Sequence, residues 1–211
     1  MEKIKIIKIM KKIKNLLVLL SITIMTSGCD RTTFSPKNGD IIFHTSKSNQ
    51  SKMISEITKS KLTHVGIIFI NKGKPYVFEA VQPVKITPLN QWIKRGVSSK
   101  YIVMRSKKIL SNDELLSMKS YGEKQMGKDY DIKFQWSNNK MYCSELVYKI
   151  YEEADIKLCS KHTFKQYNLN GESAKNAIKK RYGNNINLNE TVVTPVDLRK
   201  SNKLKVVFDN Y

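Results

Sequence analysis

Apolar positions along the chain follow two periodicities, one typical of strands and one typical of helices. Short runs of β-branched and aromatic residues predict strands, and apolar spacings of three and four predict helices. The expected strands are residues 40–44, 63–70, 76–81, 101–105 and 204–208, and the expected helices are residues 50–59, 88–95, 111–126, 142–154 and 172–181. Because the strands form hairpins rather than regular β-α-β units, the pattern predicts an α+β domain with a mainly antiparallel sheet.

The clearest predicted element is a hairpin over residues 63–81, with Gly73 supplying the positive φ of a tight turn. Both of its strands are apolar on both faces, which indicates a central place in the sheet. If the turn has two residues, Gly66 pairs with Glu79, and Glu79 lies diagonal to His64 on one face, ~7–8 Å away. A carboxylate would then reach the imidazole, whereas a slip by one residue would turn Glu79 to the other face.

The helix expected at residues 142–154 carries a cysteine in its first turn. Cys143 shares a face with Val147, Ile150 and Ala154, so its thiol is expected to point toward the core. A helix N-terminus carries roughly half a positive charge, which favours a thiolate and can bind the oxyanion of an acyl intermediate. An inert core cysteine would show the same pattern, so both interpretations stay open at this point.

Three histidines could act as a base for such a thiol. His64 begins a strand in which Gly66 has no side chain, and this would leave room for the end of a helix beside the imidazole. His44 ends a strand and His162 follows the helix in a polar loop, and either one competes for the role. Tyr142, next to the cysteine, could donate its hydroxyl to an oxyanion or simply pack beside the site.

The N-terminus has the pattern of an export signal. Several lysines precede an apolar run from Leu16 to Met25, which is too short to span a bilayer comfortably. Small residues ending at Gly28 come directly before Cys29, which resembles a bacterial lipoprotein cleavage site; a plain cleaved signal peptide or an uncleaved anchor are the alternatives. The expected divisions are a signal peptide at residues 1–28, a tether at residues 29–38 and one folded domain at residues 39–211. Lipid on Cys29 would hold that domain at a membrane of the cell envelope.

Basic residues outnumber acidic ones by 38 to 18, which gives a formal net charge of +20. Attraction to anionic lipid headgroups or to cell-wall polymer would fit this charge and an exported protein. A compositional bias toward lysine at solvent-facing positions explains the charge equally well. The sequence has no zinc-finger spacing, basic helix or basic-aromatic RNA signature, so nucleic acid is not an expected partner.

The chain has only three cysteines, which is not a disulfide framework. If Cys29 is lipidated, Cys143 and Cys159 remain, and a free thiol is the expected state of Cys143. The spacing of Cys143, His64 and His162 does not match a metal-ligand motif, so neither a metal nor a cofactor is expected.

Five short motifs occur in a fixed order along the chain. They are His64-Val65-Gly66-Ile67, Phe78-Glu79-Ala80, Gly127 through Phe134, Tyr142-Cys143-Ser144-Glu145 with the following Leu-Val-Tyr, and Thr194-Pro195-Val196-Asp197-Leu198. In this order they resemble the YiiX-like permuted papain-fold amidases, relatives of the NlpC-type cell-wall peptidases and of the lecithin-retinol acyltransferases. The resemblance runs from about Gly39 to residue 208. It implies a circularly permuted papain-like domain, with an antiparallel sheet or partial barrel packed against the helix that carries the cysteine.

The resemblance also implies roles for three residues: Cys143 as nucleophile, His64 as base and Glu79 as the group that orients His64. The implied activity is hydrolysis of an amide or ester bond through a thioester acyl-enzyme, with a cell-wall peptide as one substrate. A lipid-directed thiol hydrolase or acyltransferase acting on acyl-lipids is the second hypothesis. A non-catalytic binding lipoprotein that keeps the fold is the third, and the oligomeric state is not indicated by the sequence.

Overall fold

The computed structural model describes residues 34–183 and 185–211. Residues Ser35–Tyr211 form one compact unit. The predicted signal peptide, the predicted lipidation site Cys29 and the first half of the predicted tether lie outside the described residues and stay predictions. Within the described part of the chain, no helix combines the length and the apolar character that a membrane crossing needs.

Six strands form one antiparallel sheet in the order β4-β3-β2-β1-β5-β8. Their bounds are β1 Ile41–His44, β2 His64–Asn71, β3 Lys74–Glu79, β4 Lys85–Pro88, β5 Ile102–Ser106 and β8 Leu204–Asp209. A separate pair joins β6 (His162–Thr163) to β7 (Thr191–Val192). The predicted α+β class with an antiparallel sheet is confirmed, and β2 lies in the interior of the sheet, as its apolar faces indicated.

The register of the β2–β3 hairpin is the predicted one. Asn71 pairs with Lys74 across a two-residue turn, and the pairing continues to Ile67 opposite Phe78. Both turn residues have positive φ, 48° at Lys72 and 75° at Gly73, as a tight hairpin turn requires. This register turns the carboxylate of the last residue of β3 to the face that carries the first side chain of β2.

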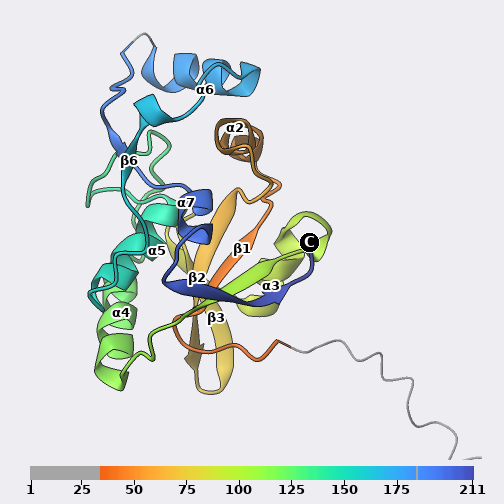
Figure 1. Ribbon diagram of the computed structural model, residues 1–211, viewed down its shortest axis with the longest axis vertical. Coiled ribbons are helices and arrows are strands. Elements are labelled where there is room, and N and C mark those ends of the chain that lie inside the picture. The colour runs from red at the N-terminus through yellow and green to blue at the C-terminus, as the bar shows by residue number, and fades with distance from the viewer. Residues whose placement is uncertain (1–33, 184) are drawn as a thin grey trace, which may run out of the picture. The chain divides into compact units, whose positions relative to one another are not determined.

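The helices flank the sheet on both sides (Figure 1). They are α2 Asn49–Thr58, α3 Leu89–Arg95, α4 Asn112–Lys124, α5 Cys143–Glu152, α6 Glu172–Tyr182 and α7 Pro195–Arg199, with short 3-10 turns η1 Val97–Ser99 and η2 Phe164–Gln166. Helix α5 packs against β2 and beside α4, whereas α3 packs against β3 and β4. Helix α2 packs against α6. The main core therefore lies between α5 and the sheet, where Val65, Ile67, Leu146 and Ile150 are fully buried.

The observed boundaries differ from the predicted ones in ways that long-range contacts explain. Ser111 caps α4 by accepting from the Glu114 N–H, as predicted, but the helix ends at Lys124. The Gly127 N–H donates to the carbonyl of Val84 instead of continuing the helix. Strand β4 was not predicted, since it pairs only with β3 at the edge of the sheet and has no apolar alternation to mark it.

Candidate active site

The thiol of Cys143 lies at the head of α5, where the helix meets the sheet. Cys143 is the first residue of the helix and is 2% exposed, and it belongs to the cluster that includes Val65 and Leu146. The thiol receives hydrogen bonds from the backbone N–H groups of Val65 and Ser144. These two donors, one on β2 and one in the first turn of α5, both favour a negatively charged sulfur.

The imidazole of His64 lies between the thiol and a carboxylate. His64 is the first residue of β2, and its Nε2 is 2.8 Å from Oε2 of Glu79, the last residue of β3. Its side chain also hydrogen-bonds Cys143. Because Nε2 is engaged by the carboxylate, Nδ1 is the nitrogen that remains for the thiol. The structure thus brings together the three side chains that the sequence analysis singled out.

Glu79 is fully buried, and its two oxygens accept three hydrogen bonds. Thr87 Oγ1 donates to Oε1 at 2.6 Å, and both His64 and the guanidinium of Arg95 engage Oε2. Burial by itself would raise the pKa of the Glu79 carboxyl. The hydrogen bonds and the positive charges overcome burial and hold this pKa at about 2. Glu79 is therefore an anion at every physiological pH.

Burial and ion pairing act in opposite directions on the thiol and the imidazole. Burial would lower the pKa of His64, but hydrogen bonds and charge at Cys143 and Glu79 raise it to about 9. Burial would raise the pKa of the Cys143 thiol, but His64 and the two backbone donors lower it below its ordinary value. Both directions favour a thiolate–imidazolium pair near neutral pH.

Gly66 provides space, although not for the helix that the sequence analysis expected. A Cβ at Gly66 would lie 2.4 Å from Val77 Cγ1, 2.9 Å from the carbonyl oxygen of Phe78 and 3.6 Å from Trp92 Nε1. These neighbours belong to β3 and α3, on the side of the sheet away from α5. The expectation that Gly66 admits a helix end beside His64 is therefore corrected: the missing side chain leaves room for the Val77 side chain and the Phe78 carbonyl of β3.

The other two histidines have different surroundings. His44 pairs with His64 across β1 and β2, and its ring stacks on Trp92 at a centroid distance of 3.9 Å. Burial first, and then the positive charges of His64 and Arg95, lower the pKa of His44 to about 2, so this ring is neutral. His162 lies in β6 and its ring is 5.8 Å from that of Tyr167.

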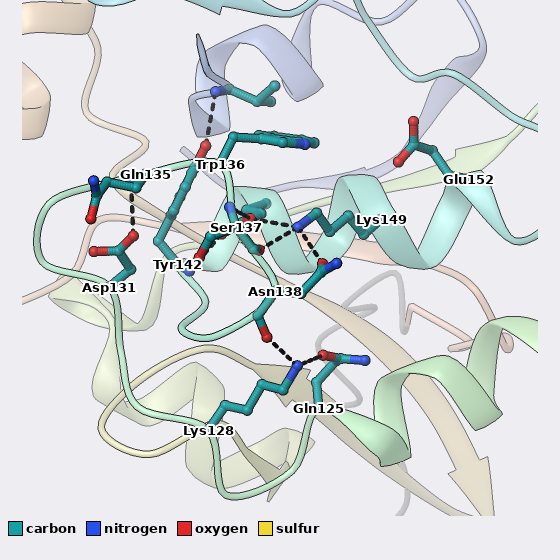
Figure 2. Close-up of polar contacts among 12 residues, drawn as sticks. Gln125, Lys128, Asp131, Gln135, Trp136, Ser137, Asn138, Tyr142, Lys149 and Glu152 are labelled. Carbon is teal, nitrogen blue, oxygen red and sulfur yellow. Dashed lines mark hydrogen bonds and ion pairs between the residues drawn. The ribbon is translucent and has the colours of Figure 1, made fainter. Parts of the chain in front are cut away.

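Of the two tyrosines near the thiol, the one that hydrogen-bonds it is Tyr130 and not Tyr142. The hydroxyl of Tyr142 accepts a hydrogen bond from the Val193 N–H at 3.2 Å (Figure 2). The hydroxyl of Tyr130 hydrogen-bonds Cys143. Burial and the nearby thiol raise the pKa of Tyr130 well above its ordinary value, so the phenol keeps its proton. The sequence analysis assigned no role to Tyr130, and its position in the Gly127–Phe134 motif was the available signal.

The segment between α4 and α5, residues 125–142, carries Tyr130 and is held by polar contacts (Figure 2). The ammonium of Lys149, on α5, donates to the Ser137 carbonyl at 2.6 Å, to Asn138 Oδ1 at 3.0 Å and to Glu145 Oε1 at 2.7 Å. Burial raises the pKa of Glu145 to about 7 against the opposing effect of Lys149. These contacts fasten the middle of the segment to the helix that carries the thiol.

The same segment is fastened at its start and at its turn. Lys128 Nζ donates to the Asn138 carbonyl at 2.5 Å and to Gln125 Oε1 at 2.6 Å. Asp131 accepts from the backbone N–H groups of Lys133 at 2.8 Å and Gln135 at 2.7 Å, which shapes the turn directly after Tyr130.

A cavity of about 780 Å³ opens beside the imidazole. Its lining includes His44, Thr63, His64, Arg95, Tyr130 and Ile132. Two of these residues, His64 and Tyr130, hydrogen-bond the thiol. Cys143 itself lines a separate and much smaller cavity of about 20 Å³. A molecule in the large cavity therefore meets the imidazole and the phenol, the two groups that hydrogen-bond the thiol.

The described residues offer no obvious metal centre. No group of three or more histidine, cysteine, aspartate or glutamate side chains among them is placed to share a metal ion. Cys143 and Cys159 are both free thiols. Burial raises the pKa of Cys159 to about 12, so the two thiols have opposite reactivity.

A sheet and helix that together present a buried cysteine, histidine and glutamate define a papain-like class of protein in which the histidine strand precedes the cysteine helix. Residues 35–208 match the family described as permuted papain-like amidase enzyme, YaeF/YiiX, C92 family. The chain belongs to this family.

Two relatives from Escherichia coli support the same assignment. The chain is 40% identical to the uncharacterized protein YiiX of strain K12 over 183 residues, which cover 86% of this chain and 89% of that protein. A crystal structure described as metalloprotein YiiX from strain O157:H7 has a TM-score of 0.81 and 40% identity, and the match covers 84% of this chain and 99% of that one.

Proposed function

We propose that this protein is a cysteine hydrolase that cleaves an amide bond through a thioester acyl-enzyme. The observation that carries the proposal is the buried line from Cys143 through His64 to Glu79. Membership of an amidase family supports the amide over other acyl bonds. Each proposed step uses only these side chains and water.

In the first half of the reaction the Cys143 thiolate attacks the carbonyl carbon, and protonated His64 gives its proton to the leaving amine. Glu79 holds the imidazole in the orientation that points Nδ1 at the sulfur. In the second half neutral His64 takes a proton from water, and the resulting hydroxide displaces the thiolate from the thioester. The acid and the regenerated thiolate–imidazolium pair complete the cycle.

The oxyanion of each tetrahedral intermediate needs donors that are already in place. The Cys143 N–H is in the first turn of α5, where a helix has no internal acceptor for it. The phenol of Tyr130 is protonated and lies against the sulfur from the side of the large cavity. We assign these two groups as the oxyanion donors, with Tyr130 in place of the Tyr142 of the sequence-based hypothesis.

The test is site-specific alkylation combined with turnover. Iodoacetamide at pH 7 is expected to modify Cys143 much faster than Cys159, measured on the separate peptides by mass spectrometry. Cys143→Ala should abolish turnover of amide substrates while circular dichroism stays unchanged, and Cys159→Ser is the matched control that should keep it. Turnover by Cys143→Ala would refute Cys143 as the nucleophile. Equal labelling of the two thiols, together with no turnover by the wild type, would favour the non-catalytic binding protein instead.

The physiological substrate is proposed to be a cell-wall peptide. The second candidate, a lipid-directed hydrolase or acyltransferase, is favoured by the net charge of +20 and by the apolar side chains of Ile54, Val81 and Ile132 in the cavity lining. Incubation with purified muropeptides and, separately, with anionic phospholipid vesicles distinguishes the two. Release of a new amine from muropeptides supports the first, and release of fatty acid or transfer of an acyl chain supports the second.

We also propose that the protein is exported and held at a membrane by lipid on Cys29. The apolar run before Gly28 and the position of Cys29 support this. Cys29→Ser should move the protein from the membrane fraction to the soluble fraction of the cell envelope, while leaving thiol labelling of the folded domain unchanged. Recovery of the variant with the membrane at wild-type levels would contradict a lipid anchor.

A further inference from the structure

The cavity beside the imidazole has an uneven charge. Lys47, in the segment after β1, and Lys94, on α3, both line it, and both side chains are exposed. Arg95 lines it as well. No aspartate or glutamate is among the described residues of the lining. A cavity whose charged lining residues are all cations attracts anions and repels other cations. The attraction is stronger where the wall has a low dielectric constant.

The two lysines are not neutralised by neighbours, whereas the arginine is. Within the described part of the chain, no carboxylate lies within ion-pair distance of Lys47 or Lys94. The guanidinium of Arg95 is paired with buried Glu79, so one negative charge already balances it. His64 and Cys143 balance each other when they form the ion pair. The charge left over at the cavity is that of the two lysines.

One of the two lysines also acts on a side chain of the cavity lining. Burial first, and then the charges of His64 and Arg95, lower the pKa of His44; the charge of Glu79 opposes them, and Lys47 adds a smaller lowering effect. Lys47 is thus close enough to influence a side chain that lines the same cavity. Lys94 directly precedes Arg95, whose guanidinium reaches Glu79, so Lys94 is one residue from the contact that fixes the catalytic carboxylate.

We propose that the cavity selects acyl substrates that carry an anionic group near the scissile carbonyl, and that Lys47 and Lys94 bind this group. The inference rests on the proposed function and deepens it by naming the substrate class. A carboxylate of a peptide and a phosphoryl group of a lipid headgroup share this chemistry, since a lysine ammonium is a point charge that accepts either anion. A neutral substrate of the same shape would gain nothing from the lysines.

Two alkylating reagents of nearly equal size test the selectivity without a known substrate. Iodoacetate is an anion and iodoacetamide is neutral; each forms a thioether with the thiolate and releases iodide. The measured quantity is the rate constant of iodoacetate divided by that of iodoacetamide at Cys143 in the full chain. The same ratio in the denatured chain is the reference, and we expect the ratio in the folded wild type to be higher. Lys47→Gln together with Lys94→Gln should lower it about fivefold, or roughly twofold for each exposed charge removed.

Lys205→Gln is the matched control, because Lys205 is an exposed lysine of β8 that does not line the cavity. The control should leave the ratio unchanged. If the double variant keeps the wild-type ratio, the anion site is refuted. The proposed function still stands in that case, because iodoacetamide would still label Cys143 rapidly. If neither reagent modifies Cys143, the proposed function fails instead.

In that second case the anion site is tested by binding. Glutarate, and not its neutral diamide, should raise the unfolding temperature of the wild type, and the double variant should lose this effect. Absence of any shift with glutarate and with glycerol phosphate would overturn the anion site on its own. Where both anions bind, the one that raises the unfolding temperature at the lower concentration identifies the source of the anionic group, a peptide carboxylate or a phosphorylated headgroup.

Discussion

Replacing Glu79 by glutamine removes one negative charge and almost no volume from the line of catalytic groups. The amide can still accept from Thr87 and contact His64, so the hairpin register and the packing are kept. What is lost is the anion that stabilises the imidazolium. Glu79→Gln therefore isolates the electrostatic part of the role assigned to Glu79.

The size of the effect follows from the geometry. The contact between His64 Nε2 and the carboxylate is 2.8 Å long and buried, and hydrogen bonds to charged groups contribute ~1.5–3 kcal/mol. One pKa unit corresponds to about 1.4 kcal/mol. The pKa of His64, now raised to about 9, should accordingly fall by about 1–2 units. The thiol loses part of the positive charge that lowers its own pKa, so that pKa should rise.

The assay is the pH dependence of Cys143 alkylation by iodoacetamide. In the wild type the thiolate–imidazolium pair exists at pH values between the lowered pKa of the thiol and the raised pKa of His64. Labelling should therefore already be fast at pH 6–7. In Glu79→Gln the pair is weakened from both sides. Labelling at pH 6.5 should fall about 10-fold or more and recover toward the wild-type rate above pH 9, where a thiolate forms without the imidazolium.

Thr87→Val is the control for a neutral contact to the same carboxylate, and it should shift the labelling profile by less than half a unit. A Glu79→Gln profile that coincides with the wild type, in a variant with unchanged circular dichroism, would show that the carboxylate does not support the ion pair. The electrostatic part of the role proposed for Glu79 would then have to be abandoned.

Three further substitutions have expected outcomes. Gly66→Ala should destabilise the fold by about 2–3 kcal/mol, because the new Cβ would lie 2.9 Å from the carbonyl oxygen of Phe78; thermal unfolding that is unchanged would contradict the close approach. Tyr130→Phe should lower kcat about 100-fold with little change in unfolding temperature, since it removes one oxyanion donor, and an unaltered kcat would exclude the hydroxyl. Lys149→Met should cost about 3–5 kcal/mol, measured by urea unfolding, because it leaves the carboxylate of Glu145 buried without its cation; a neutral result would show that the pair is dispensable.

The hairpin and the helix were predictable from sequence because local rules determine both. A two-residue turn at Gly73 sets the pairing of β2 with β3, and this pairing sets which face carries Glu79. Helical periodicity alone places the thiol of Cys143 on the buried side of α5. Local rules could thus bring Glu79 to His64 and bury the thiol of Cys143, whereas the approach of Cys143 to His64 was implied only by the family resemblance.

Arg95 and Tyr130 could not be found in the same way. Arg95 reaches Glu79 only because β4 returns along β3 and positions α3, and β4 has no local pattern that marks it as a strand. Tyr130 reaches the thiol only because Lys149 and Lys128 fasten the segment after α4. Contacts of this kind join residues through packing of whole elements, and neither periodicity nor turn chemistry reports them.

The base can precede or follow the nucleophile along the chain without changing the geometry of the site, and the reason is physical. His64 and Glu79 are fixed by one hairpin, and Cys143 is fixed by the packing of α5 against β2, so the site needs only these two local arrangements. The connection from β3 to α5 sets no angle or distance among the reacting atoms. Its length enters only through the entropy of closing a loop, which changes by ~0.6 kcal/mol for each doubling. A chain that presents the imidazole before the thiol therefore loses almost nothing, provided that β2 and the head of α5 still meet.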